Sequence, residues 1–114
     1  MKATLAELLR QIPGAPSAEW PDGERYAVAF EHGTMTVGFY APQGRDPQTP
    51  HERDEVYIIH AGRAQIVIGA ERHECQAGDA FFVGAGVVHR FENQSSDFSA
   101  WVVFWGPVGG EQPH

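Results

Sequence analysis

Three side chains in two distant stretches of the sequence could hold a divalent metal ion. His51 and Glu55 stand four residues apart in TPHERDEVY, and His89 lies in VVHRFEN. Neutral imidazole nitrogens and a carboxylate oxygen are ligands that iron, manganese, zinc and nickel all accept, so the residue types predict one divalent metal ion without choosing its identity. Two histidines and one carboxylate also form the ligand set of non-haem iron sites with open coordination positions.

The spacing of His51 and Glu55 makes a demand on the backbone. The residues from Val56 to Ile59 are β-branched or aromatic and favour a strand. Four residues of straight strand span about 13 Å, whereas two ligands of one ion each lie roughly 2.0–2.2 Å from it. We therefore expect the chain to bend in the polar stretch 52–54, so that both side chains reach the same ion.

The first part of the sequence predicts one short helix. Residues 4–12 have an apolar stripe at helical spacing, and Thr4 with Glu7 forms a capping box. The stripe consists of Leu5, Leu8, Leu9 and Ile12. Pro13 and Gly14 end the helix, and residues 1–24 are interpreted as this helix followed by a connector.

The rest of the sequence predicts an all-β domain over residues 25–107 and a flexible tail over residues 108–114. Runs of apolar and β-branched residues alternate with turn signals, which is typical of a sandwich or a barrel. The runs are ERYAVAFEHG, GTMTVGFYAP, EVYIIHAGRAQIVIG, RHECQAGDAFFVG, VVHRFEN and FSAWVVFWG.

Over roughly residues 30–105 the chain resembles a small single-domain cupin. Glu55 is followed by six residues and Gly62, and His51 stands four residues earlier, as in the first motif of that family. The second motif is matched in every spacing, with a glycine in place of its proline, at Gly78, Gly84, Gly86, His89 and Asn93. The resemblance implies a double-stranded β-helix, a jelly-roll-like barrel, preceded by a short N-terminal helix.

The resemblance also implies a metal site with one departure. Cupins commonly hold a metal ion with three histidines and one glutamate, and here only His51, Glu55 and His89 carry over. The position of the first motif histidine is Thr49. A weak fourth oxygen ligand from Thr49 or Gln48, or a water molecule, is expected there. Taken singly, each of the three residues is more often an ordinary polar residue; their joint spacing favours the metal.

The interior of the barrel is predicted from the strand pattern. Phe39, Tyr57, Ile59 and Phe91 are expected to face inward, where they either line a substrate pocket or fill the core. The last strand is apolar on both faces, which predicts that a second copy of the chain or the N-terminal helix covers its outer face. The resemblance implies a homodimer.

Charged and polar residues outside the two motifs receive simpler interpretations. Arg53 and Asp54 are expected to form a surface ion pair rather than to hold a substrate carboxylate. The remaining histidines are interpreted as a turn residue, two surface residues and a tail residue, in the order His32, His60, His73 and His114.

Composition excludes several partners and limits the compartment. The net charge is −7 with a single lysine, which predicts neither a nucleic acid partner nor an anionic membrane surface. One cysteine, Cys75, permits no intrachain disulfide and fits a reducing compartment. The start of the sequence has no signal-peptide pattern, so a cytoplasmic protein is expected.

Three functional hypotheses follow from the sequence. The leading one is a metal-binding cupin that acts on a small organic molecule, as a dioxygenase or an isomerase. The second is a non-catalytic module that binds a small ligand, because Tyr57 and Asp54 are poor candidates for a general base once the other groups bind metal. The third is a barrel without metal that serves as an assembly partner. Whether the protein is an enzyme stays open.

Overall fold

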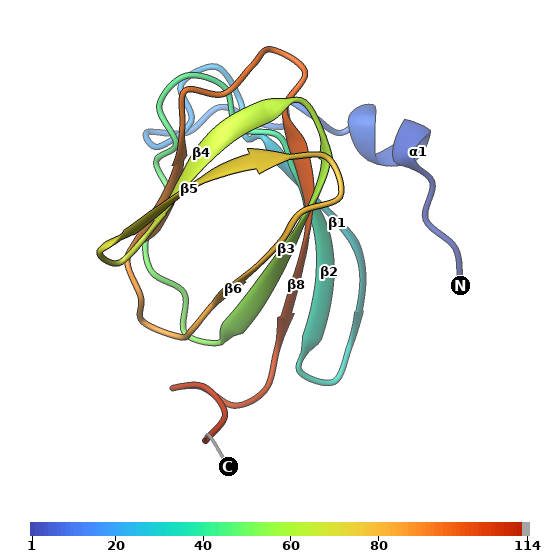
Figure 1. Cartoon of the computed structure of the whole chain (residues 1–114). Coiled ribbons are helices and arrows are strands. Elements are labelled where there is room, and N and C mark those ends of the chain that lie inside the picture. The colour runs from blue at the N-terminus through green and yellow to red at the C-terminus, as the bar shows by residue number, and fades with distance from the viewer. Residues whose placement is uncertain (113–114) are drawn as a thin grey trace.

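The computed structural model describes residues 1–112, and over this range the chain forms one α-helix and eight strands in two antiparallel sheets (Figure 1). The elements are α1 (Leu5–Leu9), β1 (Tyr26–His32), β2 (Met35–Tyr40), β3 (Asp54–Ala61), β4 (Arg63–Ile68), β5 (Glu71–Gln76), β6 (Ala80–Val83), β7 (His89–Glu92) and β8 (Ser99–Trp105). The interpretation of His114 as a tail residue lies outside the described residues. Within residues 1–112, no helix is both long and apolar enough to cross a membrane.

The strand order shows how distant parts of the sequence meet. The larger sheet has the order β1-β2-β8-β3-β6, and the smaller sheet has the order β5-β4-β7. β8 therefore lies between β2 and β3, which precede it by many residues in the chain. The two sheets face each other around a common interior (Figure 1). This confirms the predicted all-β, double-stranded β-helix with one short N-terminal helix.

The turn between β3 and β4 requires the glycine of the first motif. Gly62 has a φ of 78°, in the left-handed region that residues with a Cβ rarely adopt. A Cβ added there would lie 2.6 Å from the Cα atom of Phe98. The backbone of a neighbouring segment occupies the space that any other residue would need, so this position accepts glycine alone.

The helix is shorter than the sequence predicts. The backbone N–H of Glu7 donates to Thr4 Oγ1 at 3.2 Å, so the predicted N-cap is present. The helix ends at Leu9 instead of Ile12, because the chain tightens into i→i−3 hydrogen bonds at Gln11 and Ile12. Leu8 of the predicted stripe is buried, whereas Leu9, which the prediction also placed in that stripe, is 48% exposed.

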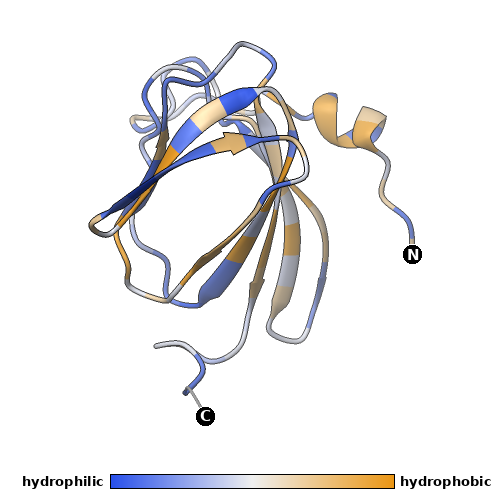
Figure 2. Cartoon of the chain, in the orientation of Figure 1, coloured by the Kyte–Doolittle hydropathy of each residue, from blue (hydrophilic) through white to orange (hydrophobic). Residues whose placement is uncertain are grey.

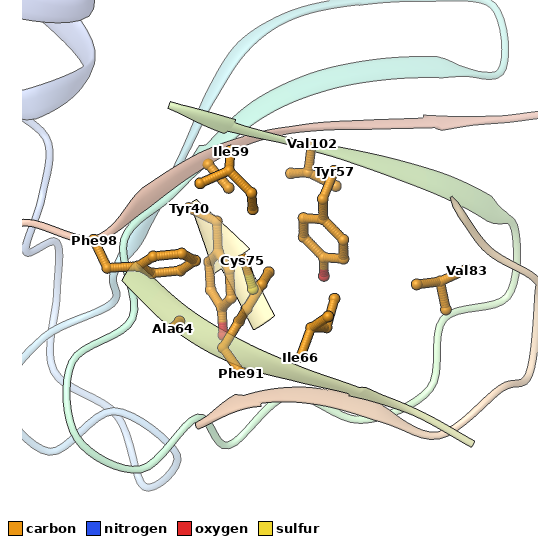
Figure 3. Packing of buried hydrophobic residues seen from close by; sticks show 11 residues of the cluster. Tyr40, Tyr57, Ile59, Ala64, Ile66, Cys75, Val83, Phe91, Phe98 and Val102 are labelled. Atoms are coloured by element: carbon orange, nitrogen blue, oxygen red, sulfur yellow. The ribbon is translucent and has the colours of Figure 1, made fainter. Parts of the chain in front are cut away.

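Two apolar clusters make up the core. The larger one fills the space between the sheets and includes Tyr57, Ile59 and Phe91, as predicted. Figure 3 shows the Tyr57 ring projecting from its strand into this interior. The smaller cluster lies on the outer face of the larger sheet, where Leu8 of α1 packs with Phe39. Figure 2 shows that α1 is mostly apolar, in keeping with this packing.

Phe39 is therefore misplaced by the sequence prediction. It is fully buried, but it points to the outer face of β2, where its ring contacts Trp101 at a centroid distance of 4.9 Å. Alternation along a strand sends successive side chains to opposite faces, and Tyr40 takes the inward direction. Phe39 is a core residue beneath α1, on the face of the sheet away from the barrel interior.

The rest of that outer face carries a row of apolar side chains. The register joins residues of β1, β2, β8, β3 and β6 in the order Phe30, Val37, Val103, Val56 and Phe82. All five are at least partly exposed, and Phe82 is 58% exposed. The helix thus covers one part of the outer face and leaves this row uncovered.

Candidate metal centre

The three predicted ligands come from both sheets. Glu55 lies on β3 of the larger sheet, and His89 is the first residue of β7 in the smaller sheet. His51 lies in the loop that enters β3. The inner faces of the two sheets are opposed. Residues that are far apart in sequence therefore point into one end of the same interior.

The loop before β3 makes the bend that the spacing demands. The chain bends at Glu52 and Arg53 and enters β3 at Asp54. The carbonyl of His51 accepts a 2.8 Å hydrogen bond from the N–H of Gly86, which belongs to the turn before His89. The loops that carry the two histidines are therefore tied to each other directly.

The geometry of the cluster matches that of a shared cation. Glu55 Oε1 lies 2.7 Å from His89 Nε2 and 3.8 Å from His51 Nε2. One ligand atom from each of the three residues lies within 4.8 Å of the other two. Two donors that bind one ion at about 2.0–2.2 Å lie roughly 2.8–3.6 Å apart. The two distances from Glu55 Oε1 fall just short of and just beyond that range, and the widest pair of ligand atoms, within 4.8 Å, would draw closer around an ion.

Unpartnered polar atoms at the cluster provide the test of whether a metal fits. Glu55 is 0% exposed and His89 is 2% exposed. While Nε2 of His89 carries no proton, neither it nor either carboxylate oxygen of Glu55 has a hydrogen-bond partner among the described residues, and only a proton or a cation between Nε2 and Oε1, which lie 2.7 Å apart, can satisfy both atoms. A buried polar group without a partner costs about 1–3 kcal/mol. A divalent cation between these atoms would satisfy them, so the residues present fit such an ion.

Hydrogen bonding prepares His89 for this role. Its Nδ1–H donates to the carbonyl of Val87 at 2.9 Å, which leaves the lone pair of Nε2 facing Glu55. Burial lowers the pKa of His89, but the carboxylate of Glu55 and the Val87 carbonyl outweigh burial and raise the pKa above its ordinary value. The same carboxylate that attracts a proton to this imidazole would attract a metal cation.

His51 stands at the open side of the cluster. Its side chain is 35% exposed, in contrast to Glu55 and His89. Burial lowers its pKa, although Glu55 opposes this effect, so the neutral form that binds metals is favoured. His51 is therefore the ligand that lies between the buried carboxylate and the solvent.

Of the two residues predicted as a fourth ligand, the structure brings Gln48 to the cluster. Gln48 Oε1 lies 3.4 Å from His51 Nε2 and accepts a 2.9 Å hydrogen bond from the hydroxyl of Tyr57. Thr49 is exposed and borders the neighbouring cavity.

A cavity of about 470 Å³ adjoins the open side of the cluster. His51, Gln48 and Tyr57 form its inner end, and aromatic residues such as Trp20 and Phe104 line its walls. Ile59 and Phe91 lie in the core between the sheets instead of lining this cavity. A small organic molecule in the cavity would reach the cluster from the His51 side.

The predicted ion pair between Arg53 and Asp54 is wrong. Arg53 Nε donates to the carbonyl of Gly106 at 2.9 Å. Asp54 is only 7% exposed, and its carboxylate accepts backbone N–H bonds from Ala85 at 3.0 Å and from Glu111 at 2.9 Å. Both side chains fasten loops near the cluster, and the turn-like composition of the segment gave no sign of this.

Part of the C-terminal segment, for which the sequence predicts a flexible tail over residues 108–114, also contacts this loop. Besides the Asp54 contact, the N–H of Gly109 donates to the carbonyl of Glu52 at 2.8 Å. Residues 109–111 are thus bound to the loop that carries His51, although the sequence predicts a flexible tail from residue 108.

A match to a protein family model shows which family the chain belongs to. The family model described as Cupin domain matches residues 36–105, more than half of the chain. The chain belongs to the cupin family. An uncharacterized protein from Streptomyces coelicolor, SCO3923, is 43% identical to this cupin over 84 residues, which cover 72% of this chain and 80% of that protein.

Solved structures of other proteins show the same cupin barrel. TT1209 from Thermus thermophilus is 26% identical and has a TM-score of 0.64, with 97% of this chain and 98% of that chain covered. The DMSP lyase DddQ from Ruegeria pomeroyi is 25% identical and has a TM-score of 0.59. That comparison covers 73% of this cupin but only 48% of the lyase chain.

Proposed function

We propose that the protein binds one divalent metal ion through His51, Glu55 and His89 and presents it to a small organic molecule in the adjoining cavity. The observation that carries this proposal is the set of buried, unpartnered atoms on Glu55 and His89, which belong to a cluster whose three ligand atoms lie within 4.8 Å of one another. The exposure of His51 toward the cavity supports the second part, because a ligand entering there would meet the open side of the ion.

The chemistry of such a site would be that of a Lewis acid. When bound, the metal ion would polarise a carbonyl or enolate oxygen of the substrate, or would activate dioxygen if it is iron. Isomerase and dioxygenase activities are both consistent with this chemistry. Fe, Mn, Zn and Ni all accept the two imidazoles and the carboxylate, so the metal has to be identified by experiment.

The protein residues around the cavity would bind and orient the substrate. Burial raises the pKa of Tyr57 well above its ordinary value, and the charge of Glu55 adds to the effect. Tyr57 therefore stays protonated; its hydroxyl donates to Gln48 Oε1 and can still accept a hydrogen bond from a ligand. The aromatic walls at Trp20 and Phe104 would exclude water from an apolar part of the ligand.

A non-catalytic binding module is the alternative, and one observation favours it. The imidazoles and the carboxylate of the cluster are assigned to the metal, and Tyr57 is held in its protonated form. Asp54, the other candidate for a base, is engaged by two backbone N–H groups.

The similarity to part of the chain of a DMSP lyase instead supports an enzymatic function. The metal-loaded protein can be tested against a panel of catechols, thiols and diketones. Turnover of any of them would favour an enzyme. Inertness toward all of them would favour the binding module.

Elemental analysis of protein purified without a histidine tag tests the proposed metal site. We expect close to one equivalent of a divalent metal in the wild type and a loss of most of it in His51→Ala and His89→Ala. His73→Ala is the matched control, because His73 is exposed on β5 and contacts only the nearby Glu71 among acidic groups of the described residues. Equal metal content in all four proteins would disprove the proposed site and would favour a barrel that serves in assembly alone.

We also propose that the protein is a homodimer in a reducing compartment such as the cytoplasm. The apolar row on the outer face of the larger sheet supports a second copy as its partner, because the row carries no charge and the chain has a net charge of −7. Two copies of an acidic protein repel each other least when the surfaces that meet carry no charge. The single cysteine, which is buried and free, supports the compartment.

A further inference from the structure

The buried carboxylate of Asp46 lies beside the candidate metal centre but is not one of its three proposed ligands. Asp46 lies in the loop between β2 and β3 and is only 7% exposed. Its Oδ1 accepts from the hydroxyl of Tyr40 and, at 3.2 Å, from the N–H of Gln48. Its Oδ2 accepts from the N–H of Phe91 at 2.8 Å and from Gln48 Nε2 at 2.6 Å. Four donors occupy about as many lone-pair sites as a carboxylate offers.

This carboxylate determines which end of the Gln48 amide faces the metal ligands. A carboxylate accepts hydrogen bonds and donates none, so only the NH₂ end of the amide can point at Asp46. The reversed amide would place its oxygen against Oδ2 and would lose the 2.6 Å hydrogen bond. Gln48 Oε1 is thereby directed toward Tyr57 and His51.

The amide oxygen has room for one further partner. An amide oxygen has two lone pairs, and the hydroxyl of Tyr57 uses one of them. The separation of Gln48 Oε1 from His51 Nε2 is 3.4 Å. This distance lies inside the range of roughly 2.8–3.6 Å expected for two donors of one ion with bonds of about 2.0–2.2 Å.

We propose that Asp46 is a positioning residue that holds Gln48 Oε1 as a fourth protein donor to the metal ion. The inference rests on the proposed metal site and extends it. Gln48 changes the donor set from two nitrogens and one oxygen to two nitrogens and two oxygens. Oxygen donors suit manganese better than softer cations, whereas zinc binds well at sites with three protein ligands. The Gln48 amide thus raises the preference of the site for Mn²⁺ relative to Zn²⁺.

The test measures binding of Mn²⁺ and Zn²⁺ to the full chain after treatment with a chelator. Gln48→Leu removes the donor, and Asp46→Asn lets the amide of Gln48 turn. We expect each substitution to weaken Mn²⁺ binding by about 10–100-fold, the usual effect of disturbing a group next to a metal ligand. Zn²⁺ binding should fall less. Gln43→Leu is the matched control, since Gln43 is an exposed amide on the same loop.

A double variant separates positioning from a general structural role. In Asp46→Asn/Gln48→Glu the new amide at position 46 can donate to the new carboxylate at position 48, whose other oxygen then faces the metal. We expect this variant to regain the Mn²⁺ affinity lost in Asp46→Asn. The visible absorption of bound Co²⁺ should follow the same order, because its intensity rises as the number of ligands falls. A purely structural effect of Asp46 would not be reversed by a change at Gln48.

The outcomes distinguish the two proposals. If the wild type binds no Mn²⁺, or binds it as His89→Ala does, the metal site itself is wrong and the inference falls with it. If His89→Ala loses the metal while Gln48→Leu and Asp46→Asn bind Mn²⁺ like the wild type, the metal site stands and the role of Gln48 and Asp46 is overturned. Should Asp46→Asn unfold, the result of Gln48→Leu decides whether Gln48 is a donor.

Discussion

Glu55 carries a buried carboxylate at a position where the fold alone would favour an apolar side chain. Its neighbours on the inner face of β3 are Tyr57 and Ile59, which are both core residues. Both of its oxygens lack hydrogen-bond partners among residues 1–112. A residue that lowers stability in this way is typical of a functional site, where stability and activity make different demands.

Replacing Glu55 should therefore have opposite effects on metal binding and on stability. Glu55→Gln keeps the shape of the side chain and removes its charge. We expect loss of the bound metal, together with an increase of about 1–3 kcal/mol in the free energy of unfolding of the metal-free protein in alkaline solution, where His89 has lost the proton that would pair it with the carboxylate. Under that condition a neutral amide costs less to bury than an unpartnered carboxylate. Denaturant unfolding in the presence of a chelator measures this. Glu74→Gln on an exposed strand position is the control, and a metal-free variant less stable than the wild type would contradict the argument.

Cys75 is a buried thiol that we expect to be unreactive. Only 3% of the residue is exposed. Burial raises the pKa of the thiol to about 11, with further contributions from Asp79 and Glu74. Because the thiolate is the reactive form, we expect iodoacetamide at pH 8 to modify Cys75 at least tenfold more slowly in the folded protein than in guanidinium chloride. Mass spectrometry of timed samples gives both rates, with free glutathione as the reference. Similar rates in the two states would show that the thiol is accessible.

At the scale of elements, the strands and their turns were largely predictable, because the apolar pattern and the glycines are local signals. The helix start at Thr4 was equally local, since a cap needs only the residues beside it. The face of Phe39 was not predictable, because it depends on where α1 docks after the sheet has formed. The two metal motifs predicted which residues would converge, whereas the hydrogen bonds of Asp46 and Asp54 depend on loops that only tertiary structure brings together.

The turn between β3 and β4 gives a prediction at this scale. Gly62→Ala introduces a Cβ that meets the backbone of Phe98, which cannot move aside without shifting β8. Gly69→Ala provides a matched control, because Gly69 also has a positive φ of 57° but its added Cβ would approach nothing closer than 3.8 Å. We expect Gly69→Ala to lower the free energy of unfolding by about 1–2 kcal/mol through backbone strain.

Gly62→Ala should lower the free energy of unfolding clearly more than Gly69→Ala does, because steric overlap is added to the same backbone strain. The difference between the two midpoints of urea unfolding measures the contribution of the close approach. Equal losses in the two variants would mean that the backbone of Phe98 relaxes around the new methyl group.

At the scale of the molecule, the uncovered row on the larger sheet predicts association. Val56 lies in this row between Val103 and Phe82. Val56→Asp should give a monomer at concentrations at which the wild type is a dimer, because each interface would then bury two unpaired charges. Light scattering coupled to size-exclusion chromatography measures the mass. Val108→Asp, at a position 65% exposed outside the sheet, should remain dimeric. A wild type of about 12.5 kDa in solution would contradict the proposal.

The central position of β8 has a consequence for the order in which the molecule matures. β8 joins β2 to β3, and Gly109 and Glu111 are bound to the segment that leads from His51 into β3. On a ribosome, β8 emerges after the two strands that it joins. The larger sheet can close only once β8 has left the ribosome, so an ion that needs the closed barrel must enter after that point.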